Sequence, residues 1–316
     1  MTANIITAPR FWKNKAILIK PEVTYGTDAI PTGAANWIEA RNVSFNPYNA
    51  ETKDRNIEMP WMGSSGKTVV AQWGQLSFDF LIAGSGTAGT APKWAPILLG
   101  CGFAETISAG VSAAYNLVTT GQGSLSCYVN IDGVYHQFVG ARGELKAKLN
   151  AKDVPMFSTV LDCLYVGPVA TAMPAITRTG WQIDEGVNHT NTTALTLNGI
   201  ALAVSTHDWA LGNQVSKIDL PGPQREVAIT DRKPTMNVEV LAPPLATFDP
   251  FALATAGTNV VASITHGSVA GRQVALAYKV VVIGVAYTQI DAEVGYKLAL
   301  EPTPVAGNDE ITVTAQ

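Results

Sequence analysis

Charged residues are scarce in this sequence, and basic residues are not in excess. Only 15% of the 316 residues are charged, and the formal net charge is −4. Specific binding to nucleic acid normally requires a basic face, so the charge balance argues against that function. Apolar residues make up 47% of the chain, which excludes disorder as its main state. A chain with so many apolar and so few charged residues either has a large core or buries much of its surface against other copies of itself.

Cysteine and long apolar runs are also lacking. The three cysteines, Cys101, Cys127 and Cys163, stand far apart, which disfavours a disulfide framework and a zinc knuckle. No window approaches the roughly 18 apolar residues of a membrane helix, so we expect no membrane partner. Residues 1–10 lack the basic start and apolar run of a signal peptide, so we expect cytoplasmic synthesis.

Motifs for chemistry are missing or incomplete. The histidines stand singly, without metal-ligand spacing, at positions 136, 189, 207 and 266. Residues 63–68 end like a phosphate-binding loop but lack its first glycine, and Gly84, Gly86 and Gly89 precede too short a helix for dinucleotide binding. Asp208, Asp231 and Asp249 are explained as turn or cap residues. We therefore expect no enzyme, no catalytic residue, no metal site and no cofactor.

The stretch from Gln72 to Gly102 carries the strongest structural signal. Leu76, Phe78 and Phe80 alternate with polar residues, which predicts a half-buried strand. A Gly/Thr/Ala loop follows, and apolar residues then recur at helical spacing from Lys93 to Cys101, ahead of Gly102.

A weaker copy of this unit occurs later in the chain. Met236, Val238 and Val240 form its strand, and a helix is predicted over 248–256 before Gly257. In the same comparison of the two halves, Val43 and Phe45 match Ile200 and Leu202, and the segment 157–163 matches the segment 294–300. The order of elements favours duplication, with chance similarity as the alternative. We predict a mainly β fold of two β-sandwich or barrel domains, 1–170 and 181–316, each with one short helix, joined by a Pro/Ala-rich linker, 171–180.

Other segments fill in the first half. Strands are expected over 37–45, 125–131, 134–139, 144–149 and 156–166, and Asp132-Gly133 is the preferred pair for a two-residue hairpin turn. Between them lies a polar arm, residues 46–67. An arm of this length is either a solvated hairpin or a contact element, and its Met59, Trp61 and Met62 favour contact.

Several loop sequences, in this order and spacing, resemble the major tail tube protein of long-tailed, non-contractile bacteriophages. They are residues 25–34 (YGTDAIPTGA), Asn46-Pro47, the Arg55 arm with Gly63, residues 84–94 (GSGTAGTAPKW) and residues 98–103 (LLGCGF). The resemblance covers residues 18–166, and residues 180–316 match only through the internal repeat. It implies two tandem tail-tube β-sandwich domains and a structural role in the virion tail, assembled in the host cytoplasm.

The resemblance also implies partners and surfaces. Subunits would close into stacked rings around a bore that passes double-stranded DNA without binding it, and would contact the tape-measure protein and other tail proteins. Two domains per chain favour a trimeric ring of pseudo-sixfold symmetry over a hexamer whose second domain decorates the outside. Arg55, Met59, Trp61 and Met62 would contact another ring or subunit. The carboxylates Asp79 and Glu239 lie on the polar side of their strands. They would line the bore if that side of the sheet points inward, and the outer surface if it points outward.

One alternative belongs to a different class. A virion adhesin or carbohydrate-binding β-sandwich would have a similar composition. Such a protein needs aromatic residues grouped on an exposed face, and Trp181 and Trp209 are the only hints of one.

Overall fold

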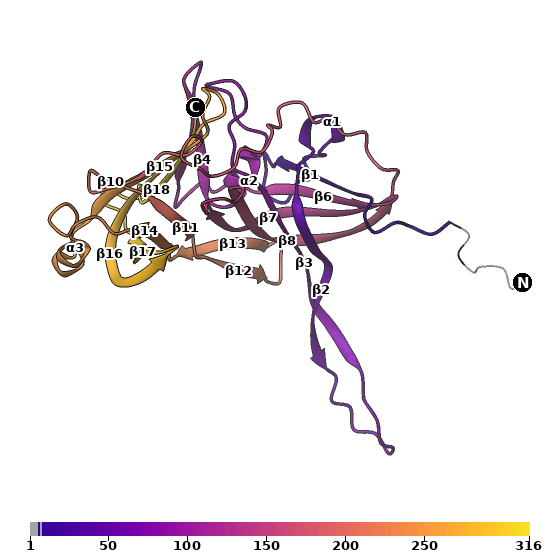
Figure 1. Cartoon of the computed structure of the whole chain (residues 1–316). Coiled ribbons are helices and arrows are strands. Elements are labelled where there is room, and N and C mark those ends of the chain that lie inside the picture. Colours follow the sequence, from indigo (N-terminus) through magenta and orange to yellow (C-terminus); the bar gives the residue numbers. More distant parts are fainter. Residues whose placement is uncertain (1–5, 7) are drawn as a thin grey trace, which may run out of the picture.

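The computed structural model describes Ile6 and residues 8–316, and its fold is mainly β (Figure 1). Strands account for 52% of the residues that the structure describes and helices for 5%, which confirms the expected mainly β fold. Most of the N-terminal segment on which the expectation about export rests, residues 1–5 and 7, lies outside the described residues.

Six antiparallel strands of the N-terminal half lie in the order β1-β6-β7-β8-β3-β2. We call them the N-terminal strand set. Helix α1 (Gly33–Asn36) follows β1, and helix α2 (Ala95–Gly100) follows β3 and precedes the hairpin of β4 (Phe103–Ser108) and β5 (Ser112–Leu117). The strands of the set are β1 (Lys15–Pro21), β2 (Arg41–Asp54), β3 (Lys67–Leu81), β6 (Leu125–Ile131), β7 (Val134–Lys148) and β8 (Met156–Ala170).

Six strands of the C-terminal half, the C-terminal strand set, lie in the order β9-β15-β16-β17-β14-β11. They are β9 (Leu195–Leu197), β11 (Val204–Ala210), β14 (Thr235–Leu241), β15 (Val260–His266), β16 (Val274–Ile290) and β17 (Glu293–Pro302). Around them lie β10 (Ile200–Leu202), β12 (Asn213–Asp219), β13 (Arg225–Arg232), α3 (Pro250–Ala256) and β18 (Ile311–Ala315). Residues 171–180, between the sets, contain no helix or strand.

The two strand sets have the same order when β1, β6, β7, β8, β3 and β2 are matched with β9, β15, β16, β17, β14 and β11. In each set a helix follows the matched strand β3 or β14. Leu76 pairs with Leu161 and Met236 pairs with Leu300, so the expected match of Leu76 with Met236 requires Leu161 to match Leu300. A bulge lies five residues before Leu76 and five before Met236, at Ala71 and Asp231, which supports this match.

Two other expected matches are wrong, one in register and one in the strand chosen. Phe157 corresponds by ladder position to Tyr296 and not to Val294, because alternation repeats every two residues and cannot detect a shift of two. Phe45 corresponds to Trp209 in β11, since the short β10 lies at the opposite end of the C-terminal set from β11.

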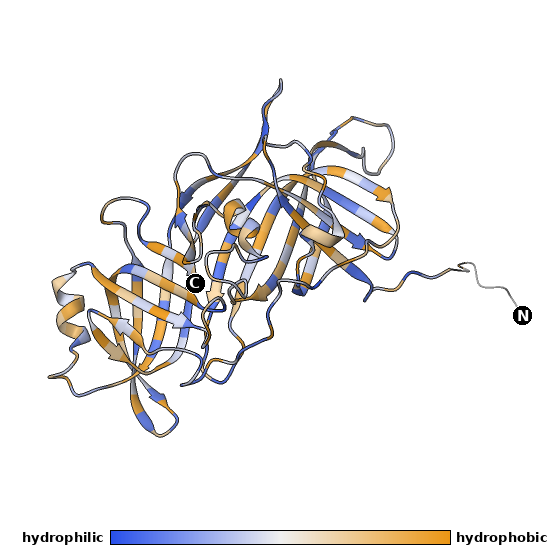
Figure 2. Cartoon of the chain, turned by 90° about the horizontal axis from the view of Figure 1, so that it is seen from above, coloured by the Kyte–Doolittle hydropathy of each residue, from blue (hydrophilic) through white to orange (hydrophobic). Residues whose placement is uncertain are grey.

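The apolar face predicted for β3 forms the middle of the core. Leu76, Phe78 and Phe80 are buried, and Phe80 packs against Trp94 and Phe157. The buried cluster continues through residues of both strand sets. Figure 2 shows the alternation of apolar and polar residues along the strands of both sets.

The strand sets also share hydrogen-bonded neighbours. Strand β11 pairs with β14 on one side and, over Asp208–Ala210, with Lys146–Lys148 of β7 on the other. Strand β18 pairs with both β16 and β5. We call the β11–β7 contact the internal seam.

Local predictions had mixed outcomes. The Asp132-Gly133 turn is confirmed, with φ of 42° and 93°. The two strands expected over 134–139 and 144–149 are one strand, β7, whose ladder with β8 has register shifts between Gln137 and Phe138 and between Val139 and Arg142. Strand β2 begins at Arg41, because Trp37 forms only an isolated bridge to Leu18.

The expected helices form, but not every turn assignment was right. Asp249 caps α3 by accepting the backbone N–H groups of Phe251 and Ala252. Asp208 and Asp231 lie within strands β11 and β13, so the explanation of both as turn or cap residues was wrong.

Candidate assembly surfaces

The polar arm is a β-hairpin that projects from the body of the protein (Figure 1). Strands β2 and β3 extend through it as far as Asp54 and Lys67, and residues 55–66 form its tip. In the tip, Trp61 is 67% exposed and Met62 is fully exposed, whereas Met59 is partly covered and Arg55 is exposed. The tip therefore offers large apolar side chains to a partner surface.

The β12–β13 hairpin occupies the matching place between β11 and β14. Both hairpins contain one extra residue on the returning strand: the pair Glu51–Ala71 is followed by Thr52–Val69, and Gln214–Asp231 is followed by Val215–Ile229. The bulges lie at equivalent ladder positions. The β12–β13 hairpin is thus the counterpart of the projecting arm.

This second hairpin is folded down onto the N-terminal strand set. Val227 is buried against Trp73, Val139 and Leu164, on the face of that set opposite its main core. Tyr25 accepts a hydrogen bond from the backbone N–H of Val227 at 2.6 Å. Burial raises the pKa of the Tyr25 phenol to about 12, so it stays a neutral hydroxyl.

Charged side chains fasten the same contact. Arg142 donates to the backbone oxygen of Val227 at 3.0 Å, and its guanidinium lies 4.7 Å from the centre of the Tyr25 ring. Lys217 of β12 is 2.9 Å from a carboxylate oxygen of Asp162 in β8. This hairpin was not predicted from the sequence, although Pro221-Gly222 lies between two short runs of strand-forming residues and is typical of a turn.

The internal seam is held by one carboxylate as well as by the strand ladder. Glu144 of β7 accepts the backbone N–H groups of Gly212 and Asn213 at 2.8 and 2.6 Å. The Asn213 amide donates in turn to the backbone oxygens of Cys101 and Gly143. Partial burial raises the pKa of Glu144, opposed by those backbone donors. Nothing in the sequence marked Glu144, because both partners come from the other half of the chain.

The run of paired strands that passes through the internal seam is β16-β17-β14-β11-β7-β8-β3-β2, and the outer edge at each end of this run has no neighbour among the described residues. Strand β2 pairs only with β3, and β16 beyond Val280 pairs only with β17. Beside the β16 edge is an aromatic patch of Phe251, Tyr287 and Tyr296, with ring centres 5.5 to 6.1 Å apart. Tyr287 is 67% exposed and Phe251 38% exposed. Unpaired edges and exposed aromatic groups are typical of surfaces that bind another chain.

Asp79 and Glu239 lie at matched ladder positions, both on the face of the sheet opposite the main core. Asn42 donates to Asp79 at 2.7 Å, and Lys297 lies 3.5 Å from Glu239. The same face carries exposed lysines, so its charge is mixed and not purely acidic. They are Lys146, Lys148 and Lys297.

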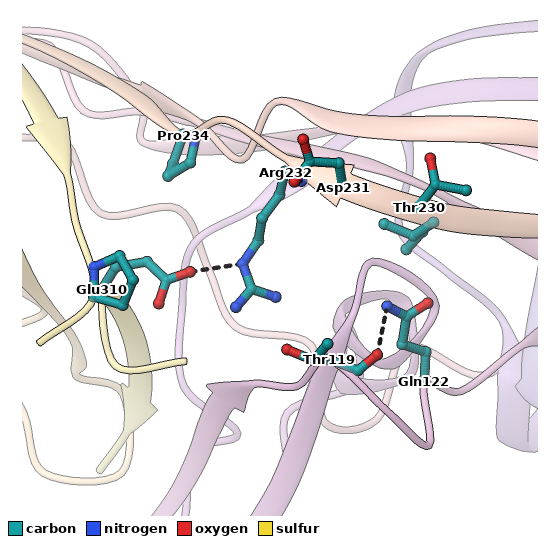
Figure 3. A pocket seen from close by; sticks show the side chains of 9 residues that line it. Thr119, Gln122, Thr230, Asp231, Arg232, Pro234 and Glu310 are labelled. Atoms are coloured by element: carbon teal, nitrogen blue, oxygen red, sulfur yellow. Dashed lines mark hydrogen bonds and ion pairs between the residues drawn. The ribbon is translucent and has the colours of Figure 1, made fainter. Parts of the chain in front are cut away.

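A pocket of about 270 Å³ lies where β13 meets the loop after β5 and the loop before β18 (Figure 3). Arg232 and Glu310 cross it in a 2.6 Å ion pair, and Arg232 also donates to the backbone oxygen of Val118. Arg232 and one carboxylate oxygen of Glu310, Oε1, thus hold three segments together, whereas Oε2 of Glu310 has no hydrogen-bond partner among the described residues. Within the described ranges, no group of three or more His, Cys, Asp or Glu side chains is placed to hold a metal ion.

The chain matches no model of a known protein family and no curated protein sequence. No helix among the described residues is long and apolar enough to cross a membrane.

Proposed function

We propose that this chain is a structural subunit of a phage tail tube, which assembles into stacked rings around a bore for DNA. The proposal is carried by one observation. The two six-stranded sets have equal order, the terminal strand β11 of one set pairs with the end of β7 in the other, and the matching strands, β2 and the end of β16, have no further neighbour among the described residues. A unit that adds to itself in this head-to-tail way closes into a ring if the rotation allows.

The same observation supports a division into two tandem domains that arose by duplication. The matched strand orders, the matched helices and the shared bulge are independent features, and chance similarity would have to reproduce all three. Both domains contribute to one continuous sheet, which favours placing both in the ring. A trimer with six similar positions is therefore proposed over a hexamer decorated by the second domain.

The projecting arm supplies the contact between rings or between subunits. Its counterpart, β12–β13, buries Val227 against a neighbouring strand set, which is the kind of contact that the arm tip would make on another copy. Trp61 and Met62 are its apolar anchors, Met59 adds apolar area, and Arg55 is a charge partner.

The carbohydrate-binding alternative loses its two hints. Trp209 is only 3% exposed, and Trp181 is half-buried, packed edge-on against Trp37 with its indole N–H donated to the Trp37 backbone oxygen. The exposed aromatic group that the structure does contain, the patch of Phe251, Tyr287 and Tyr296, lies beside an unpaired strand edge, which favours another chain as its partner.

Electron microscopy of the purified protein over a concentration series tests the proposal. We expect hollow rings or tubes, and end-on averages with threefold symmetry and six similar lobes. Sixfold rings of two-lobed subunits would keep the function and reject the trimer. Protein that stays monomeric at millimolar concentration would contradict the function.

A further inference from the structure

The internal seam specifies how a second copy of the chain would add to the first. In the seam, Trp209 of β11 lies opposite Ala147 of β7, and its ring packs against Phe157 with centres 6.2 Å apart. Burial of Trp209 thus closes the open end of the core of the N-terminal strand set.

Each of these residues has a counterpart at a free edge. Phe45 corresponds to Trp209, because they pair with the matched residues Leu76 and Met236. Tyr287 corresponds to Ala147, because Tyr287 pairs with Tyr296 as Ala147 pairs with Phe157. The first counterpart lies on β2 and the second on the free part of β16.

We propose that the β2 edge of one copy, Ser44–Asn46, pairs antiparallel with the β16 edge of a second copy, Ala286–Thr288. Phe45 then covers the aromatic patch of Phe251, Tyr287 and Tyr296, as Trp209 covers Phe157. This assignment rests on the proposed ring, and it specifies the residues and the register of the contact.

The groups at both edges fit this occupant, since Phe45 is half-buried at the margin of the N-terminal core, with its ring 5.5 Å from that of His136, and Tyr287 is exposed. The aromatic patch lies where the C-terminal core reaches the unpaired part of β16. At the corresponding position of the N-terminal set, strand β11 pairs with β7 and covers the core. Pro47 aligns with Leu211, which donates to the Leu145 backbone oxygen in the internal seam. Proline lacks that N–H, so the contact between copies has one hydrogen bond fewer.

Register-specific cross-linking tests the pairing. In the internal seam, Leu149 donates to His207 and Leu211 donates to Leu145, so Asp208 lies opposite Lys148 as a non-hydrogen-bonded pair. Such pairs bring Cα atoms within disulfide range. The equivalent pair between copies is Ser44 with Thr288.

The test variant is Ser44→Cys with Thr288→Cys, oxidised under ring-forming conditions. We expect covalent dimers and higher oligomers, up to a closed ring, on non-reducing gels. Asp208→Cys with Lys148→Cys is the positive control and should cross-link within one chain. Ser44→Cys with Gln289→Cys is one residue out of register and should cross-link at least tenfold less. The native cysteines are buried in the monomer.

A second variant checks the aromatic contact without disturbing the monomer. Tyr287→Asp changes an exposed side chain, so the circular dichroism spectrum should be unchanged while rings are lost. Rings that form without cross-linking of the Ser44 and Thr288 positions would overturn the pairing and leave the tube function intact. Absence of both rings and cross-links up to millimolar protein would overturn both.

Discussion

His207 gives the clearest prediction about stability. Its imidazole is fully buried, and neither ring nitrogen has a hydrogen-bond partner among the described residues. Its ring lies 5.5 Å from that of Tyr278, whose hydroxyl is also unpartnered there. Burial lowers the pKa of His207 from 6.5 to about 4.

The sign of the pH effect follows from that shift. The unfolded chain takes up a proton on this histidine near pH 6.5, whereas the folded chain does so only near pH 4. The contribution of neutral His207 to the free energy of unfolding is therefore fully present above pH 7, and it is lost as the pH falls from 6.5 towards 4. The full shift corresponds to about 3 kcal/mol, of which about 2 kcal/mol is lost between pH 7.5 and pH 5.

Urea unfolding of the wild type and of His207→Phe at pH 7.5 and pH 5 measures this contribution. Between pH 7.5 and pH 5, the wild type should lose about 2 kcal/mol more of its free energy of unfolding than His207→Phe does. His189→Phe, at an exposed site, is the matched control and should change the difference by less than about 0.5 kcal/mol. A pH dependence equal in wild type and His207→Phe would refute the reasoning.

Three further predictions concern the arm, its folded counterpart and a helix cap. Replacing residues 56–65 by a short Gly/Ser turn should leave the thermal midpoint within about 2 °C, since the tip is exposed, but should prevent stacking of rings in electron micrographs. Trp73→Ala should cost about 3–5 kcal/mol in urea unfolding and should speed amide exchange in β12–β13 first, and equal exchange there would contradict the packing argument. Asp249→Ala should cost about 1 kcal/mol in the same assay, whereas Asp249→Asn should cost less than half of that.

The sequence predicted the parts of the fold that local patterns encode. Alternation identified β3 and β14, glycine and proline bounded the two main helices, and Asp132-Gly133 identified a hairpin. Pairing between distant strands leaves no such local signal, which is why the matches of Phe157 and Phe45 were displaced. The seam residue Glu144 was undetectable for the same reason, since its hydrogen-bond donors lie in the other half of the chain.

For the candidate surfaces, the sequence indicated the arm but not its shape. Exposed Met and Trp in a polar stretch suggested contact, whereas the hairpin arose because β2 and β3 continue their ladder beyond the core. The free edges were not predictable, since an edge is defined by the absence of a neighbour in the folded sheet.

The two seams of the proposed ring differ in a way that follows from how each one forms. The internal seam closes once, within one chain, where the linked strand sets have a high effective concentration. It can therefore include the partly buried carboxylate of Glu144, whose desolvation is offset by backbone N–H groups. At the edge between copies, the ladders make Gly284 the counterpart of Glu144 and Tyr287 the counterpart of Ala147. That seam must form between separate molecules, and aromatic burial supplies its free energy without the desolvation of a charge. In a duplicated chain, one seam can serve folding within the chain and the other can serve association between chains. In a ring of six identical single-domain subunits, every seam would form between separate molecules.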